Sequence, residues 1–320
     1  MDKELTRPNR KELIKLKAYR KEDTIFASNA RLLQSKWRKE QLKLEEGSRI
    51  NKGEEKFWGN LLPEGAAKAG YNFLTDTIRK VVEDEIKSET SKTKLIEKQR
   101  MLCNMLSSQP LCFNLFGELK DKPDIATKIF KKLLPKTITI DKISCIKFEH
   151  SPRKKNNTTY LGDKTAFDVF VEYFENGDKC FLGIEVKYTE ALREESKKTA
   201  ENNYKKHPRY KEITEKYGKF KLDFMNKLKI PPLSQIWRDH LLSIALEKEG
   251  EGEEKYKKGH FVFLYPSKNK ECKDGIDEYK KYLTDQNSIL DIHLEKVIDE
   301  IGEEIKEGWA KDLKSRYLGE

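Results

Sequence analysis

The stretch that decides the fold is TAFDVFVEYFENGDKCFLGIEVKYTE, residues 165–190. Two segments rich in β-branched and aromatic residues flank Asn176-Gly177, and this arrangement is the strongest short-range signal for a β-hairpin with a two-residue type I′ turn. With Asn176 and Gly177 at the centre of the turn, counting outward makes Phe170 face Gly183 across the two strands. The sequence therefore predicts both the hairpin and its register.

This register places three polar side chains on one face of the hairpin. Asp168 faces Glu185, and Lys187 follows on the same face because side chains alternate along a strand. Directly opposed Cβ atoms lie about 5 Å apart, so the two carboxylates repel each other unless a cation lies between them. Mg²⁺ accepts such hard oxygen ligands, and it can activate a water and neutralise charge on a phosphate. Lys187 would hold or deprotonate that water, or bind the phosphate as a point charge.

The remaining hairpin residues predict that both strands are buried. We expect five apolar side chains to point to the opposite face and to pack against helices: Phe167, Val169, Val171, Ile184 and Val186. Gly183 leaves room for Phe170 beneath the site, and the backbone carbonyl of Val186 is a natural additional metal ligand. The alternative is an exposed strand on which Lys187 forms only a structural salt bridge, but the run FLGIEVKY is too apolar for a surface strand.

A strand-borne Asp followed by Glu-x-Lys on the next antiparallel strand resembles the signature of the PD-(D/E)XK superfamily, here a restriction-endonuclease-like family of bacterial proteins. Five further segments are similar to that family and span most of residues 25–267: NARLLQSKWR, AGYNFLTDTI, SSQPLCFNLFG, QIWRDHLLS and FVFLYPS. Ala166-Phe167-Asp168 replaces the Pro-Asp that often forms the first motif. That departure is common within the superfamily.

The resemblance implies a Mg²⁺-dependent endodeoxyribonuclease, with Mn²⁺ able to substitute, that serves restriction, phage defence or mobile-element biology. DNA would be its substrate, a homodimer would suit cleavage of both strands of a duplex, and a defence role would involve a partner protein. Two other readings stay open. One is a non-catalytic nucleic-acid-binding or scaffolding module of the same fold, and the other is a nuclease that acts on RNA or on repair intermediates.

The resemblance also ranks residues outside the hairpin. Glu118 would supply an extra acidic metal ligand from a helix before the sheet, or else be a solvated residue at a helix end. Gln235 would contact the nucleic-acid backbone or a water of the site, or else lie on the surface. Asp239 and His240 are consecutive helical residues and so do not face each other, which favours packing or capping for both.

A basic segment, NNYKKHPRYKEITEKYGKFK (residues 202–221), interleaves aromatic and basic side chains. Such mixing suits a surface that follows phosphates and stacks on bases. Lys205, Lys206, Arg209 and Tyr210 are therefore our candidate nucleic-acid contacts. The alternative is an amphipathic helix whose aromatic residues pack inward while its lysines reach solvent.

Composition agrees with a nucleic-acid-binding protein of the reduced cytoplasm. The 320 residues carry a net charge of +10, with the basic excess in residues 1–150 and 201–250. Basic surface attracts phosphate backbones, although a solvated surface gives the same count. Five scattered cysteines form no CxxC pair, no apolar run is long enough for a membrane span, and the N-terminal residues show no secretory signal.

The pattern along the chain predicts an α/β protein in two parts. Residues 1–106 form an N-terminal helical extension packed on the core, with no turn residue between Lys11 and Glu46. Residues 107–320 form a restriction-endonuclease-like core, a mixed central sheet flanked by helices. Beside the hairpin, strands are expected within 137–151, 260–266 and 288–294, with helices between them and at the C-terminal end.

Overall fold

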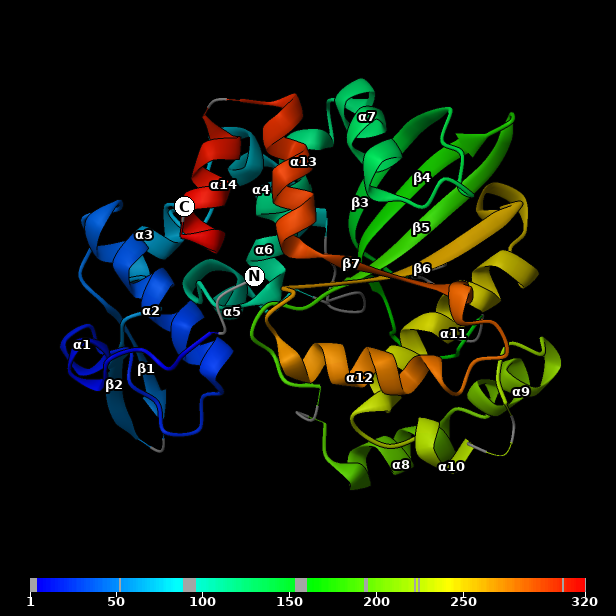
Figure 1. Cartoon of the computed structure of the whole chain (residues 1–320), viewed down its shortest axis with the longest axis horizontal. Helices are drawn as coiled ribbons and strands as arrows, with labels where there is room; N and C mark the ends of the chain where they lie inside the picture. Colours follow the sequence, from blue (N-terminus) through cyan, green and yellow to red (C-terminus); the bar gives the residue numbers. More distant parts are fainter. Residues whose placement is uncertain are drawn as a thin grey trace. The chain divides into compact units, whose positions relative to one another are not determined.

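A computed structural model describes residues 5–51, 53–88, 96–152, 160–192, 195–221, 223, 225–306 and 308–319. They form two compact units, shown in Figure 1: a first unit within residues 1–90, 96–118 and 297–320, and a second unit within residues 119–296. The sequence suggested a division between residues 106 and 107. In the structure, the boundary between the two units lies after Glu118, and residues 297–319 belong to the same unit as the N-terminal residues. None of the described helices has the length and apolarity required to cross a bilayer.

The second unit is built on a five-stranded mixed sheet in the order β3-β4-β5-β6-β7. Its strands are Lys142–His150 (β3), Phe167–Glu175 (β4), Asp178–Val186 (β5), Lys258–Tyr265 (β6) and Ile289–His293 (β7). The pairs β3–β4 and β4–β5 are antiparallel, and β5–β6 and β6–β7 are parallel. The predicted mixed sheet is confirmed.

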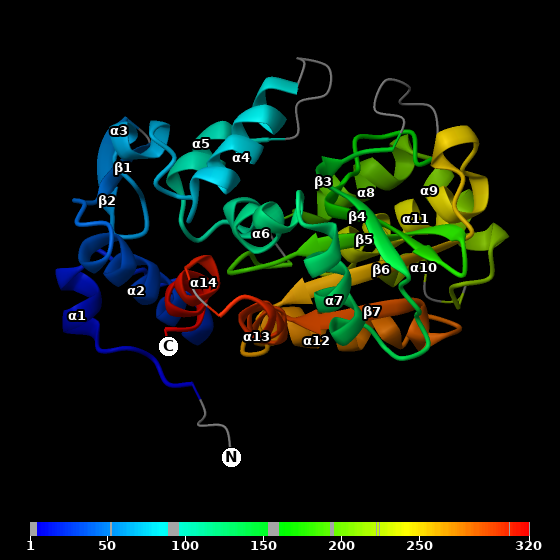
Figure 2. The same ribbon diagram turned by 90° about the horizontal axis from the view of Figure 1, so that it is seen from above.

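Helices flank this sheet, as Figures 1 and 2 show. They are Pro123–Leu133 (α7), Lys197–Lys206 (α8), Arg209–Lys216 (α9), Met225–Leu228 (α10), Leu233–Glu249 (α11) and Lys270–Lys280 (α12), with short 3-10 turns at Gly252–Glu254 and Gln286–Ser288. Helix α11 packs on β6 and contacts α9, α10 and α12, while α7 packs along β3. Because α11 is buried over most of its length, it forms the centre of a large core, rich in aromatic residues, that includes Trp237, Phe261 and Tyr279.

The hairpin has the predicted turn and register. Asn176 and Gly177 have φ angles of 52° and 82°, the positive values that a type I′ turn requires at both central residues. Phe170 pairs with Gly183, and the pairing continues in step to Val169 and Ile184. Strand β5 is buried from Cys180 to Val186, since it is a central strand of the sheet.

The packing around Gly183 differs from the prediction. A Cβ on Gly183 would lie 2.3 Å from the ring of Phe167, so Phe167, and not Phe170, occupies the space that the glycine leaves. Phe167 was expected on the opposite face of the sheet. Instead its ring centroid lies 6.0 Å from that of Phe170 and 6.2 Å from that of Phe181. Phe167 is the first residue of β4, where alternation no longer dictates the side-chain direction, and the missing side chain at Gly183 gives its ring a place in the aromatic core.

The first unit combines the N-terminal residues with the C-terminal helices. Its elements are Arg10–Lys15 (α1), Ile25–Glu40 (α2), Gly47–Asn51 (β1), Glu54–Trp58 (β2), Glu64–Lys68 (α3), Asp76–Ser88 (α4), Lys98–Cys103 (α5), Ser108–Phe116 (α6) and Trp309–Leu318 (α14). A 3-10 turn, Gly117–Leu119, and helix Leu294–Glu304 (α13) cross from one unit to the other. Ser107 caps α6, because its side chain accepts a hydrogen bond from the backbone N–H of Gln109.

The uninterrupted helix expected in the N-terminal residues is wrong. Helix α1 ends at Lys15, and Lys17 then takes a left-handed conformation with φ of 50°. A new helix begins at Ile25, where the side chain of Thr24 accepts a hydrogen bond from the backbone N–H of Ala27. The hairpin of β1 and β2 was not predicted either, since its strands carry mostly exposed polar residues.

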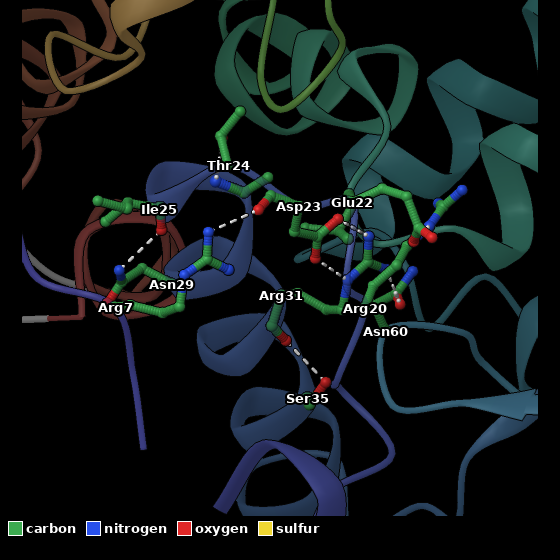
Figure 3. A network of polar contacts seen from close by, with 12 residues as sticks. Arg7, Arg20, Glu22, Asp23, Thr24, Ile25, Asn29, Arg31, Ser35 and Asn60 are labelled. Carbon is green, nitrogen blue, oxygen red and sulfur yellow. Dashed lines mark hydrogen bonds and ion pairs between the residues drawn. The ribbon is translucent and has the colours of Figure 1, made fainter. Parts of the chain in front are cut away.

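Buried arginines hold the first unit together. Figure 3 shows Arg31 of α2 between Asp23 and Asn60. Its Nε and Nη2 donate to both carboxylate oxygens of Asp23 at 2.6 and 2.9 Å, and its Nη1 donates to Asn60 Oδ1 at 2.7 Å. A bidentate arginine–carboxylate pair fixes orientation as well as distance. The loop before α2 is thereby fixed to the segment after β2.

A second buried arginine attaches α14. Arg316 is fully buried, and its Nη1 and Nη2 donate to the backbone and side-chain oxygens of Asn72 at 2.7 and 2.5 Å. Its Nε donates to Gln34 Oε1 at 3.1 Å, and Gln34 donates in return to the Arg316 carbonyl. These buried hydrogen bonds add to the apolar clusters of this unit, which include Leu13 and Trp37.

The contact at Gly183 predicts a stability defect. Gly183→Ala should destabilise the second unit by about 2 kcal/mol, because the added methyl group displaces the Phe167 ring from a packed core. Urea denaturation measures the change. Gly302→Ala is the control, since nothing lies within 4 Å of its added methyl group, and it should be neutral or slightly stabilising. Adding Phe167→Leu to Gly183→Ala should recover part of the loss, and no recovery would show that the ring is not the cause.

Candidate active site

A pocket of about 380 Å³ opens in the second unit above the predicted hairpin residues. The sheet contributes Glu149, Asp168 and Glu185, and the loop before β4 contributes residues 163–166. Helices α8, α9 and α11 contribute Asn203, Tyr210, Gln235, Arg238 and Asp239, and His207 lines the pocket from the link between α8 and α9. The pocket is therefore rich in carboxylates.

The centre of the pocket is the carboxylate pair that the register predicted. Asp168 Oδ2 accepts a hydrogen bond from the backbone N–H of Val186 at 2.8 Å. Glu185 Oε1 lies 2.7 Å from the ammonium of Lys187 and accepts a hydrogen bond of 2.7 Å from the Gln235 amide. The structure thus brings together the four residues predicted to be catalytic.

The electrostatics of this cluster follow from burial and like charge. Burial, followed by the negative charges of Glu185 and Glu149, raises the pKa of Asp168 well above its usual value. Burial alone would lower the pKa of Lys187, but the charges of Glu185 and Asp168 outweigh it and raise that pKa. The cluster therefore carries a tightly held ammonium and an excess of carboxylates.

This donor set fits a divalent cation. Carboxylate oxygens are the ligands that Mg²⁺ prefers, and one or two of them suffice because water and substrate phosphate complete its octahedron. Glu185 is only 4% exposed, so a cation bound there would offset the cost of burying its charge. The predicted carbonyl ligand from Val186 stays a prediction, since the contact seen is its N–H donation to Asp168.

Glu118 belongs to the first unit and not to the unit that holds the pocket. It is 6% exposed, and one of its carboxylate oxygens accepts a hydrogen bond of 2.5 Å from the Thr75 hydroxyl. The second unit by itself assembles the carboxylate cluster without Glu118. A role for Glu118 as a metal ligand stays a prediction.

The predicted nucleic-acid contacts fall into two groups. Lys205 and Lys206 are exposed at the end of α8. Arg209, in contrast, donates from Nε to the Tyr160 carbonyl at 2.8 Å and pairs with Glu212 and Glu249. Tyr210 is 2% exposed and donates from its hydroxyl to Asp163. The lysines are accessible to a polyanion, whereas Arg209 and Tyr210 are engaged in holding the fold.

Helix α11 brings two residues to the pocket that sequence reasoning missed. Arg238 and Asp239 follow Gln235 by three and four positions, so all three lie on one side of the helix. In the sequence, the spacing of three and four residues from Gln235 could have indicated that both residues share its side of the helix. His240 packs in the core as expected, because its ring stacks on Phe261 and contacts Tyr279. Asp239, for which packing or capping was also expected, lines the pocket.

Two further acidic residues reach the pocket from outside the hairpin. Glu149, the penultimate residue of β3, has a left-handed conformation with φ of 45°, and Asp163 comes from the loop before β4. Asp163 accepts hydrogen bonds from the backbone and hydroxyl of Thr165 at 2.9 and 2.7 Å. No pattern in the sequence marks Asp163, because only the path of the loop brings it near the sheet.

Comparison with known proteins agrees with this geometry. A family model described as the PD-(D/E)XK nuclease superfamily matches residues 21–319. No curated protein and no solved structure shows significant similarity to the chain.

The buried ion pair predicts a specific stability defect. Lys187→Met should cost about 3 kcal/mol in the absence of divalent cations, because it leaves Glu185 buried without its counter-ion. Adding Glu185→Gln should recover most of that loss, since the unpaired charge is then removed. Urea denaturation in EDTA measures both variants. A loss of the same size in the single and the double variant would contradict the ion pair as its cause.

Proposed function

This chain belongs to the PD-(D/E)XK nuclease superfamily, whose members are generally metal-dependent nucleases, and we propose that it is a Mg²⁺-dependent endonuclease that hydrolyses phosphodiester bonds in DNA. The observation that supports this proposal best is the convergence of Asp168, Glu185 and Gln235 at one pocket, with Lys187 paired to Glu185. A metal-dependent hydrolase needs carboxylates beside a cationic side chain in a place that substrate can reach.

Each residue of the cluster has a defined part in this proposal. Asp168 and Glu185 bind the cation from opposed strands. The cation, when bound, activates the attacking water and offsets charge on the phosphate. Lys187 holds the water or a phosphate oxygen through its ammonium, which the carboxylates keep charged. Gln235 orients Glu185 by its hydrogen bond of 2.7 Å.

A nucleic acid is the substrate that the superfamily implies, and DNA is the finer proposal. Lys205 and Lys206 are exposed on α8, the helix that also contributes Asn203 to the pocket. A phosphate backbone that enters the pocket would pass near positive charge there. Roles in restriction, phage defence or mobile-element biology, with a partner protein, rest on the family resemblance alone and on no residue of the site.

One pocket of this kind acts on one strand at a time. We therefore propose that a homodimer cuts duplex DNA, with one pocket for each strand. A single chain acting alone would instead produce nicks, so accumulation of nicked plasmid before linear plasmid distinguishes the two arrangements.

The main test is plasmid cleavage by the purified chain with Mg²⁺ or Mn²⁺. We expect cleavage that EDTA stops and that Asp168→Asn, Glu185→Gln or Lys187→Met each lowers by about a hundredfold to a thousandfold, the range seen when an essential electrostatic group is removed. Gln235→Ala should lower the rate less, because it removes only the residue that orients Glu185. Gel analysis over time measures the rates.

Comparison of substrates completes this test. Duplex DNA, single-stranded DNA and RNA of one sequence are incubated with the chain and with its Asp168→Asn variant. If the chain cleaves RNA faster than DNA, the proposed substrate is wrong, but the proposed metal-dependent phosphodiester hydrolysis still holds. Cleavage that persists in EDTA, or in all three hairpin variants, would contradict the proposed active site.

The exposed lysines of α8 give a separate prediction for binding. In an Asp168→Asn background, Lys205→Gln with Lys206→Gln should weaken duplex binding and reduce the slope of log affinity against log salt by about 1–2, since each lost phosphate contact removes about 0.9. Fluorescence anisotropy measures the slope. Lys128→Gln with Lys131→Gln, an exposed pair on α7, is the matched control and should leave the slope unchanged.

A further inference from the structure

Arg238 is a cationic side chain in a pocket whose lining is rich in acids. The other charged residues of the lining are Glu149, Asp163, Lys164, Asp168, Glu185 and Asp239. Lys164 is exposed, whereas the side chain of Arg238 is only 17% exposed and so is largely enclosed by protein. A polyanion that enters this pocket is attracted by positive charge held in a fixed place, and Arg238 provides such a charge on the helix side.

A single carboxylate holds the guanidinium of Arg238. Its Nη1 donates to Glu195 Oε2 at 2.8 Å, and the same oxygen accepts a hydrogen bond from the Ser234 hydroxyl at 2.9 Å. The other oxygen of Glu195 accepts a hydrogen bond of 3.0 Å from the side-chain amide of Asn203. Since Ser234 and Arg238 are on α11 and Asn203 is on α8, Glu195 joins two helices that line the pocket.

The ion pair with Glu195 uses only one nitrogen of the guanidinium. Nε and Nη2 of Arg238 donate to no residue in the part of the chain that the structure describes, and neither atom is completely buried. These two nitrogens form the side-on edge of a guanidinium, which can donate two parallel hydrogen bonds to one anion. In Arg31 the same edge binds both carboxylate oxygens of Asp23, at 2.6 and 2.9 Å.

Arginines that stabilise the fold are bonded more completely. Arg31, Arg209 and Arg316 each donate hydrogen bonds from all three of their nitrogens, Nε, Nη1 and Nη2. Complete bonding is expected of a half-buried guanidinium, because an N–H group that loses water without gaining a partner destabilises the protein. The pair with Glu195 therefore accounts for the position of Arg238 but not for its open Nε–Nη2 edge.

Arg238 lies beside the predicted catalytic residues. It follows Gln235 by one helical turn, and side chains with this spacing have Cβ atoms about 5–6 Å apart on the same side of a helix. Gln235 in turn donates to Glu185 at 2.7 Å. A phosphate bound next to Glu185 is thus within reach of a group one turn along α11.

We propose that Arg238 binds a phosphate of the nucleic-acid substrate through its Nε–Nη2 edge, and that Glu195 is the positioning residue that holds the guanidinium in the pocket. The inference rests on the proposed function, because the same pocket receives the phosphodiester chain. A guanidinium edge matches two phosphate oxygens and so fixes orientation, which the point charge of an ammonium does not. Because Glu195 already fixes the side chain, little conformational entropy is lost when the phosphate binds.

The experiment measures binding of a short fluorescein-labelled DNA duplex to the full chain by fluorescence anisotropy, in EDTA and in an Asp168→Asn background, over a range of salt concentrations. Arg238→Gln should weaken binding by about tenfold or more, because two charge-assisted hydrogen bonds are lost. It should also reduce the slope of log affinity against log salt by about 0.9, the value for one phosphate contact. Lys128→Gln, an exposed residue of α7, is the control for the loss of one positive charge and should change neither quantity.

Arg238→Lys separates the guanidinium edge from its charge. It keeps the positive charge and the ion pair with Glu195, so the salt slope should stay the same while the affinity falls. This variant also decides the question if Arg238→Gln does not fold, which thermal unfolding reveals.

Two substitutions of Glu195 test its positioning role. Glu195→Ala and Glu195→Gln both remove one negative charge, which by itself strengthens binding to a polyanion. We expect Glu195→Ala nevertheless to weaken binding, because the guanidinium is released. Glu195→Gln should bind much more tightly than Glu195→Ala, since its amide oxygen still accepts a hydrogen bond from Nη1. Equal or tighter binding by Glu195→Ala than by the unsubstituted background would overturn the positioning role.

The results distinguish this inference from the proposed function. Unchanged affinity in Arg238→Gln, or in Arg238→Lys, would overturn the phosphate contact while leaving the nuclease proposal intact. Binding that depends on Arg238 in a chain that does not cleave DNA with Mg²⁺ would contradict the nuclease proposal alone. A background protein that does not bind the duplex at all would contradict both.

Discussion

The structure of the second unit depends on one unfavourable arrangement, two carboxylates side by side on neighbouring buried strands. Asp168 and Glu185 repel each other, and their burial makes the repulsion costly. The neighbouring residues compensate for it: the Val186 N–H donates to Asp168, and Lys187 and Gln235 both act on a single oxygen of Glu185. The pocket therefore holds more buried carboxylates than the one ammonium of Lys187 can neutralise.

The hairpin was predictable because its information is local. Asn176-Gly177 fixes the turn, the turn fixes the register, and the register alone puts Asp168, Glu185 and Lys187 on one face. The surrounding pocket was not predictable in this way. Glu149, Asp163 and Asp239 come from a strand end, a loop and a helix, and only the tertiary fold brings them together.

The first unit shows where composition misleads. Runs of lysine, arginine, glutamate and leucine predicted helical structure without a turn between Lys11 and Glu46, but a cap at Thr24 and a left-handed Lys17 divide the segment. The same polar composition also gave no indication that two arginines are buried in the unit. Arg31 and Arg316 are charged residues that surface patterns assign to solvent, yet both are buried and join distant segments by directed hydrogen bonds. Amphipathic periodicity indicates which apolar side chains are buried, but it gives no signal for buried arginines.

The hydrogen bonds of Arg316 to Asn72 and Gln34 have a consequence for how the protein forms during synthesis. The strands of the second unit all lie between Leu119 and Lys296, so all of them have been made once the ribosome passes that point. The first unit begins earlier but lacks the α14 arginine until residues beyond 297 are made. At about 5–20 residues per second, the N-terminal helices wait on the order of ten seconds or more for it. The part that starts first is completed last: the strands that carry the carboxylate pocket have all been made while the first unit still lacks its last helix.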